Sequence, residues 1–221
     1  MKNKLALLFF LIICHQALCQ TKIDELVSVT FPSNPKKLDT VVENMTLTSY
    51  VFTSQKQNFQ LQRIVFKNDN DTSTSNYPND TKGLQEFYKK TISESVEKIK
   101  PNGFILRDSL SSFIGNYVIY KVRFYSIKTK KDVCEMVYLY LNKNLYTINY
   151  FSVNNFDEKI KNNFFATIKI NSQKKPFQYK NLVSNPKKLG YVVGKLFMYI
   201  VFVSLFIFVL AKFRKKTLLP K

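Results

Sequence analysis

The stretch VCEMVYLYLNKNLYTINYFS, residues 133–152, decides the fold of this chain. Apolar and polar side chains alternate along both of its halves, which is typical of β-strands, and Asn142-Lys143-Asn144 separates the halves as a turn. The pattern predicts two antiparallel strands, at residues 132–141 and 145–152. If the hairpin pairs about Lys143, one of its faces carries six large side chains, which are Met136, Tyr138, Tyr140, Tyr146, Ile148 and Tyr150.

This aromatic face has two interpretations. Packing beneath a helix, in the core, is the usual role of such a face. Tyrosine also combines apolar area with a hydroxyl that needs a partner, so the same face can line a ligand pocket or form a partner surface. Exposure of Tyr138 and Tyr140 would favour the second interpretation, and burial would favour the first.

Two helices are predicted on either side of the hairpin. Residues 81–100 form the first, because apolar side chains recur there at spacings of three and four, at Leu84, Phe87, Tyr88, Thr91, Ile92, Val96 and Ile99. Pro101-Asn102-Gly103 ends this helix. Asn155 and Glu158 form a capping pair that begins a shorter helix, in which Phe156, Ile160 and Phe164 are predicted to share a face.

Further strands complete the domain. Alternation between turn signals predicts them at residues 27–31, 47–53, 59–67, 104–110, 116–126 and 167–170. The predicted fold class is therefore α+β, an antiparallel sheet with packed helices. One C-terminal transmembrane helix is predicted in addition.

The order of these segments resembles a known family. The segments VSVTFPSNP, LQEFY, FILRDS, GNYVIYKVRFYS, the hairpin and FDEKIKNNFFATIKI follow one another as in the PsbP-like α/β/α sandwich, over residues 26–171. The marks of the resemblance are Phe-Pro-x-x-Pro after the first strand, the region of Gly115 and Tyr120, and the phenylalanine-rich last helix. The resemblance implies a small exported domain with a binding or assembly role. It carries no shared catalytic motif onto this sequence.

The first 19 residues predict an export signal. Lys2 and Lys4 precede an apolar run of ten residues, and Ala17-Leu18-Cys19 supplies small residues for cleavage before Gln20. Ten apolar residues are too few to span a bilayer as a helix, which needs about 20. The domain at residues 20–172 is therefore predicted to be extracytoplasmic, either periplasmic or extracellular.

The C-terminal part predicts a single membrane span. Residues 190–211 are long enough to cross the hydrocarbon core, with Lys195 reaching toward the outer interface. A basic stalk, residues 173–189, precedes the span, and a basic tail, residues 212–221, follows it in the cytoplasm. The cationic residues of the tail that support this topology are Lys212, Arg214, Lys215 and Lys216.

The charge balance indicates which classes of partner suit the domain. The whole chain has a formal net charge of +19, and residues 20–189 hold 26 Lys and Arg with all 15 Asp and Glu, a net charge of +11. Export makes nucleic acid an improbable partner, and no basic and aromatic RNA-binding motif is found. The predicted partners are anionic lipid headgroups of the membrane and another envelope protein.

The residue inventory argues against most enzyme classes. His15, in the signal, is the sole histidine, which excludes Ser-His-Asp and Cys-His systems from the exported domain. The five glycines are too scattered for a phosphate-binding loop. Cys134 is the sole cysteine after the signal, and its strand position predicts a buried structural thiol. The neighbouring acids Asp24-Glu25 and Asp157-Glu158 are predicted to stabilise the starts of elements.

A polar loop at residues 67–83 contains one candidate metal site. Asp69, Asp71 and Ser73 follow the spacing that begins a calcium-binding loop, and Asp80 stands at its twelfth position. Thr74 occupies the place of the turn glycine, and aspartate is a poorer bidentate ligand than glutamate at position twelve. A solvated loop is the alternative interpretation of this segment.

These observations lead to one functional prediction with two alternatives. We expect a membrane-anchored, non-catalytic binding or assembly module with no cofactor, which interacts with another envelope protein. A carrier or sensor of a small ligand in an aromatic-lined pocket is the first alternative. An enzyme that uses an unrecognised carboxylate site is the second.

Overall fold

The computed structural model describes residues 19–42, 45–54, 56–66, 78–152 and 155–179. The predicted membrane span and cytoplasmic tail lie outside these residues, as does the predicted export signal up to residue 18. Among the described residues, none of the helices has the length and apolar character needed to cross a membrane.

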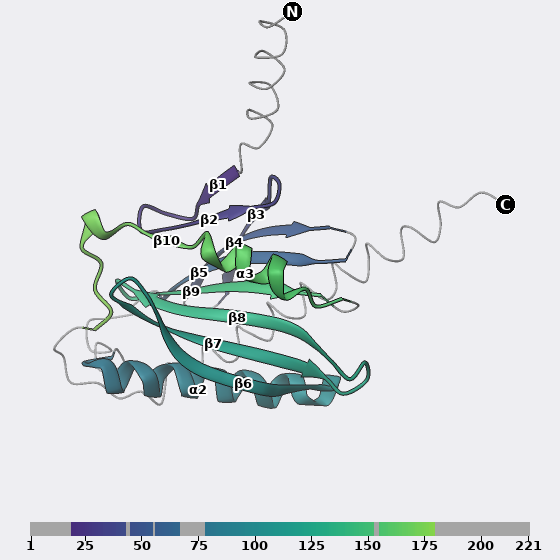
Figure 1. The fold of residues 1–221 in the computed structure, drawn as a ribbon. Coiled ribbons are helices and arrows are strands. Elements are labelled where there is room, and N and C mark those ends of the chain that lie inside the picture. The colour runs from purple at the N-terminus through teal and green to yellow at the C-terminus, as the bar shows by residue number, and fades with distance from the viewer. Residues whose placement is uncertain (1–18, 43–44, 55, 67–77, 153–154, 180–221) are drawn as a thin grey trace, which may run out of the picture.

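A seven-stranded antiparallel sheet forms the centre of the domain (Figure 1). Its strands, in spatial order, are β3 (Lys36–Val42), β4 (Met45–Thr53), β5 (Asn58–Phe66), β9 (Asn144–Phe151), β8 (Lys131–Leu141), β7 (Tyr117–Ser126) and β6 (Phe104–Ile114). Neighbours in this order are mostly neighbours in sequence, and each such pair needs only a short connection. Among the described residues, β3 and β6 are the two edge strands of the sheet, with no neighbour on their outer side.

Two helices and a small sheet cover the faces of the large sheet. The helix α2 (Thr81–Ile99) lies along one face, beneath β6 and β7, and continues into the short helix η2 (Lys100–Asn102) (Figure 1). The helix α3 (Glu158–Ala166) packs on the other side, against β2 and β9. There it joins a three-stranded antiparallel sheet of β1 (Cys19–Lys22), β2 (Val27–Phe31) and β10 (Lys169–Ile170). The mixed α/β class with antiparallel sheets agrees with the prediction.

The hairpin β8–β9 forms as expected, but in a different register. Asn142 and Lys143 both have positive φ, 47° and 65°, which makes a two-residue turn of the kind that matches the twist of a hairpin. Leu141 therefore pairs with Asn144, and Tyr138 pairs with Thr147. The expected pairing about Lys143 is wrong by one residue, and a shift of one residue turns one strand over relative to the other.

The core consists of two apolar layers, one on each side of the sheet. The layer beneath α2 contains Met136, Tyr138 and Tyr140 from β8, and the layer beneath α3 contains Tyr146, Ile148 and Tyr150 from β9. The six side chains predicted to share one face are thus divided between opposite faces. This correction follows directly from the register of the hairpin.

The helix boundaries test the capping predictions. Asp80 is the N-cap of α2, where its Oδ1 accepts a hydrogen bond from the Gly83 backbone N–H at 2.7 Å. The N-cap of α3 is Asp157, whose Oδ1 accepts from the Ile160 N–H at 2.9 Å, and not the predicted Asn155.

Two strands, β1 and β3, were not predicted. The strand β3 is exposed along nearly its whole length and so shows no alternation of buried and exposed residues.

The chain after β10 does not leave the domain at once. Beyond η3 (Ser172–Lys174) it runs past the strand ends of the large sheet (Figure 1), where Asn142 N–H donates to the Phe177 carbonyl at 2.9 Å and Phe177 N–H donates to Asn142 Oδ1 at 2.9 Å. The buried Gln178 amide then pairs with the backbone of Val118, accepting from its N–H and donating to its carbonyl, both at 2.7 Å. We call residues 175–179 the strap. The predicted stalk was expected to begin at residue 173, but the chain up to Gln178 is bound to the domain.

Candidate functional site

The sequence-predicted aromatic face does not form a site. All six of its side chains, from Met136 to Tyr150, are at most 2% exposed. Two of the tyrosine hydroxyl groups have internal partners: Tyr146 donates to Asp24 Oδ2 at 2.5 Å, and the Tyr150 oxygen accepts from the Asp157 N–H at 3.3 Å. Burial on two separate faces favours the core interpretation over a ligand pocket or partner surface.

The candidate calcium loop is described only in part. Asp69, Asp71 and Ser73 lie outside the described residues, and Asp80 caps α2. In the part of the chain that the structure describes, no group of three or more histidine, cysteine or acidic side chains is arranged so that it could hold a metal ion. The loop remains a prediction from sequence.

The neighbouring acids have the structural roles predicted for them. Asp24 Oδ1 accepts from the backbone N–H groups of Leu26 and Val27, at 2.8 and 3.0 Å, at the start of β2. Asp157 caps α3. For Cys134, burial and then the charge of Glu135 raise the pKa of the thiol far above its ordinary value, which makes it a poor nucleophile.

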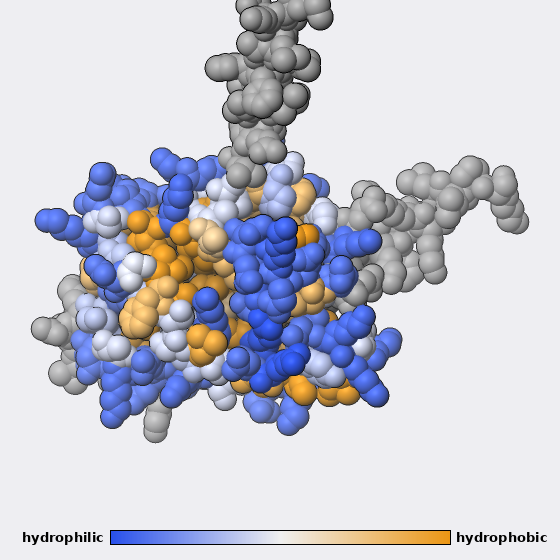
Figure 2. All heavy atoms as spheres, in the orientation of Figure 1, coloured by the Kyte–Doolittle hydropathy of each residue, from blue (hydrophilic) through white to orange (hydrophobic). Residues whose placement is uncertain are grey.

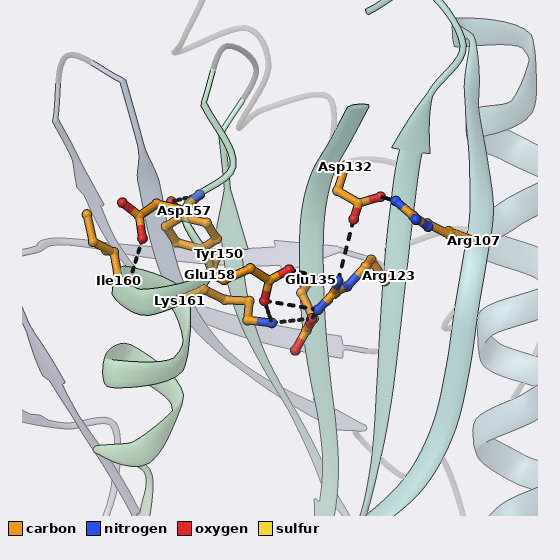
Figure 3. Close-up of polar contacts among 9 residues, drawn as sticks. All are labelled: Arg107, Arg123, Asp132, Glu135, Tyr150, Asp157, Glu158, Ile160 and Lys161. Atoms are coloured by element: carbon orange, nitrogen blue, oxygen red, sulfur yellow. Dashed lines mark hydrogen bonds and ion pairs between the residues drawn. The ribbon is translucent and has the colours of Figure 1, made fainter. Parts of the chain in front are cut away.

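A network of charged side chains lies where α3 meets β7 and β8 (Figure 3). At its centre is Lys161, which is only 3% exposed although its helix lies on the surface. Its Nζ donates to Glu135 Oε2 at 2.8 Å and to Glu158 Oε2 at 2.6 Å. A buried ammonium requires such partners, because an isolated charge would lose its hydration without compensation.

Arg123 extends the network on the sheet. Its Nε and Nη2 donate to the same Glu135 oxygen at 3.0 and 2.6 Å, and Nη1 lies 2.8 Å from Glu158 Oε1. A longer contact of 3.4 Å joins Nη1 to Asp132, which Arg107 also binds at 2.6 Å. The Phe156 ring closes one side, with its centroid 5.5 Å from Arg123 Cζ and 5.7 Å from Lys161 Nζ.

The network is balanced in charge. Three cationic side chains, Arg107, Arg123 and Lys161, are paired with three carboxylates, Asp132, Glu135 and Glu158. Burial opposes the charge on Arg123, but the hydrogen bond and charge of Glu135 prevail and raise the pKa of the guanidinium. Burial likewise acts against the Glu158 charge, yet the bonds from Lys161 and Arg123 hold the pKa of this carboxyl below its ordinary value.

A cleft of about 220 Å³ opens beside the network. Asp108 and Leu110 of β6, Lys121 and Arg123 of β7, and Lys161 of α3 line it. Lys121 forms no ion pair with any of the described residues, in contrast to the two other cationic groups. Figure 2 shows apolar side chains gathered beside the hydrophilic surface of α3, so the same face of the molecule presents both kinds of contact.

This arrangement suits binding better than acid–base chemistry. A general acid or base works best when its pKa lies near the working pH. Here the Glu158 carboxyl is held ionised and the Arg123 guanidinium is held protonated. The available chemistry is therefore that of a charged and apolar contact surface.

Sequence reasoning missed the members of this network. Arg123, Glu135 and Lys161 come from three elements, and only the fold brings them together. The available signal was the interruption of apolar patterns by a charge, as in VIYKVRFY and VCEMVYLY. The predicted face of Phe156, Ile160 and Phe164 did not include Lys161, yet the buried residues of α3 are Lys161 and Phe164, and Ile160 is partly exposed.

Comparison with known proteins gives a likeness of fold. No family model matches the chain, and no curated protein matches it. Among solved structures, the solution structure of cyanobacterial PsbP (CyanoP) from Synechocystis sp. PCC 6803 is similar, with a TM-score of 0.47 and 8% sequence identity, over 68% of this chain and 90% of that one. It is a protein of the family that the sequence resembles. At this identity the likeness concerns the fold alone.

Glu158 makes a testable contribution to stability at low pH. Its pKa in the folded chain lies below the ordinary value of 4.5, so the folded state binds fewer protons than the unfolded state. Its stabilisation is full above about pH 4.5 and is lost as the pH falls through the folded-state pKa. We expect the melting temperature of Glu158→Gln to fall less between pH 6 and pH 3 than that of the native chain.

The matched control for this experiment is Glu86→Gln, since Glu86 is exposed on α2. Melting curves of all three proteins at five pH values test the prediction. A Glu158→Gln curve that stays parallel to the native curve over the whole range would contradict it.

Proposed function

We propose that this chain is a membrane-anchored, non-catalytic assembly module that binds another protein of the cell envelope. Its N-terminal domain, of the PsbP-like α/β/α type, lies on the extracytoplasmic side. The chain crosses the membrane once, at residues 190–211, and ends in the cytoplasm. The basic stalk faces the anionic headgroups of the outer surface.

The sequence supports this topology at both ends. The apolar run after Lys4 has the length of a cleavable signal, whereas the apolar run near the C-terminus has the length of a span. The basic residues from Lys212 onward favour a cytoplasmic tail. The described domain, with its net positive composition, suits a site beside an anionic membrane.

The strap is the single observation that carries the proposal. Gln178 and Phe177 bind the strap to the large sheet, so the chain is held to the domain as far as residue 178. Only 11 residues, 179–189, separate Gln178 from the proposed span, and these reach at most about 40 Å. A domain on so short a tether meets its partner at the membrane surface, in a restricted orientation.

The proposal of a non-catalytic role rests on the charged network. Glu135, Glu158 and Asp132 are all engaged in ion pairs within the described residues, and the pairing of Glu158 with Lys161 and Arg123 holds the pKa of its carboxyl below the ordinary value. The chain beyond residue 15 contains no histidine that could serve as a base. A role in binding requires no proton transfer by these groups.

Crosslinking in membranes of the native host tests the proposal. We expect the full chain to resist extraction by alkaline carbonate, to lose its domain to protease added from outside, and to be crosslinked to one envelope protein in a fixed ratio. Recovery in the soluble fraction would contradict the anchoring. Reproducible absence of a crosslinked protein would contradict the assembly role.

A further inference from the structure

The two edge strands of the large sheet differ in how well they are protected against pairing with a further strand. The edge strand β3 carries Lys36, Lys37 and Asp39, and the Lys37 ammonium lies 2.9 Å from the Asp39 carboxylate. Charged side chains of this kind prevent further strands from pairing with an edge. The other edge strand, β6, has its charges and its irregular register near Arg107 and Asp108, in its first half.

The second half of β6 has no charged residue or proline that would prevent pairing with a further strand. Residues 109–114, with the sequence SLSSFI, contain no charge and no proline, and they pair with β7 in continuous register. No residue of β6 is fully buried. Alternate residues of an edge strand direct their N–H and C=O groups away from the sheet, where they can pair with another chain.

Large apolar side chains flank this edge on both faces. Leu110 pairs with Lys121 on the α3 side and is 45% exposed, while Phe113 pairs with Val118 on the α2 side and is 66% exposed. Each face also has a hollow beside β6. The cleft of about 220 Å³ lies on the α3 side, and a second hollow of about 170 Å³ lies between Leu106 and Ser109 of β6 and the helix α2.

We propose that β6, at residues 109–114, receives an extended acidic segment of the partner protein as an added strand. Successive side chains of an added strand point to opposite faces, so one set would reach the cleft and the other the hollow beside α2. Backbone hydrogen bonds to β6 supply affinity, and the two cavities select the side chains. This inference rests on the proposed function and names the surface that performs it.

Charge favours an acidic partner over a second copy of this chain. The cleft is lined by three cationic side chains, Lys121, Arg123 and Lys161, against two carboxylates, those of Asp108 and Glu135. Because Arg123 and Lys161 are paired already, Lys121 is left for the incoming segment. Two copies would bring together domains that each have a net charge of +11 over residues 20–189.

Site-specific photocrosslinking in native membranes tests the inference. Benzoylphenylalanine is placed in the full chain at Ser111 on β6 or, as the matched control, at Thr40 on β3. We expect the envelope protein to be crosslinked from Ser111 and not from Thr40, through an extended segment rich in Asp and Glu. The same protein crosslinked only from other surfaces would overturn this inference and leave the proposed function standing. Absence of any partner would overturn both, and a crosslinked dimer of this chain would replace the acidic segment by a second copy.

A peptide probe gives a second measurement on the purified full chain. The peptide acetyl-(Glu-Val)5-amide should slow hydrogen exchange at residues 109–114, and the corresponding Lys-Val peptide should not. Phe113→Glu should weaken the binding about tenfold, whereas Val41→Glu, an exposed substitution on β3, should leave it unchanged. Equal protection by both peptides, or protection of β3 in place of β6, would overturn the inference.

Discussion

Replacing Phe164 by alanine should lower the free energy of unfolding by about 3 to 5 kcal/mol. Phe164 is the residue through which α3 holds the sheet, and it is only 4% exposed. Its ring lies 5.0 Å from that of Phe59 on β5 and 5.6 Å from that of Phe31 on β2, measured between centroids. Three elements therefore lose contact at once, and these neighbours come from strands that cannot collapse into the gap without moving the sheet.

The effect is measured by urea unfolding of the full chain in detergent micelles. Near-ultraviolet circular dichroism is the suitable signal, since the chain has 13 tyrosines and no tryptophan. Phe113→Ala is the matched control, because the same residue type is removed from an exposed position on β6, and it should change stability by less than about 0.5 kcal/mol. Equal losses in the two variants would show that α3 does not depend on Phe164.

Replacing Lys161 by methionine should cost about 3 kcal/mol. The methionine side chain keeps much of the apolar volume of lysine, so the loss reports on the charge. Without the ammonium, Glu135 keeps Arg123 as its partner but becomes a buried carboxylate with one cation in place of two. This places the expected cost near the lower end of the range for breaking a buried ion pair.

A double-mutant cycle separates this charge effect from packing. Glu135→Leu removes the carboxylate, and in that background Lys161→Met should cost much less, with a coupling free energy of about 1 to 3 kcal/mol. Arg123 retains Asp132 and Glu158 in every variant of the cycle. Additive losses would mean that Lys161 stabilises α3 by its contacts alone, including its position beside the Phe156 ring.

Local sequence patterns predicted the elements whose type and boundaries are set by their own residues. The helix expected at residues 81–100 is found as Thr81–Ile99, because a regular apolar face and Pro101 define it without reference to the rest of the chain. The hairpin was predicted as an element, but its register was not. That register depends on Asn142 and Lys143 both adopting positive φ, which shortens the turn from three residues to two.

The candidate site was harder to predict than the fold. Arg123 and Glu135 are opposite one another on paired strands, and Lys161 reaches them from a helix 26 positions beyond Glu135. Single-sequence patterns assign a charged residue on a short helix to the solvent side, which is why Lys161 was not among the residues singled out on this helix. The unprotected edge of β6 is equally a property of the assembled sheet, since it follows from which strands lack a second neighbour.

The strap also determines how a mechanical load would enter the domain. Three hydrogen bonds of the Gln178 amide join residue 178 to Val118 in β7 and Tyr140 in β8, two strands inside the large sheet. A pull applied from the C-terminal side therefore acts first on these interior strands, and it reaches the two-residue pairing of β10 with β2 only after Gln178 has been released. The shortest of the described strands is thus shielded from tension, and a domain tethered in this way would first lose the hydrogen bonds of the strap under load.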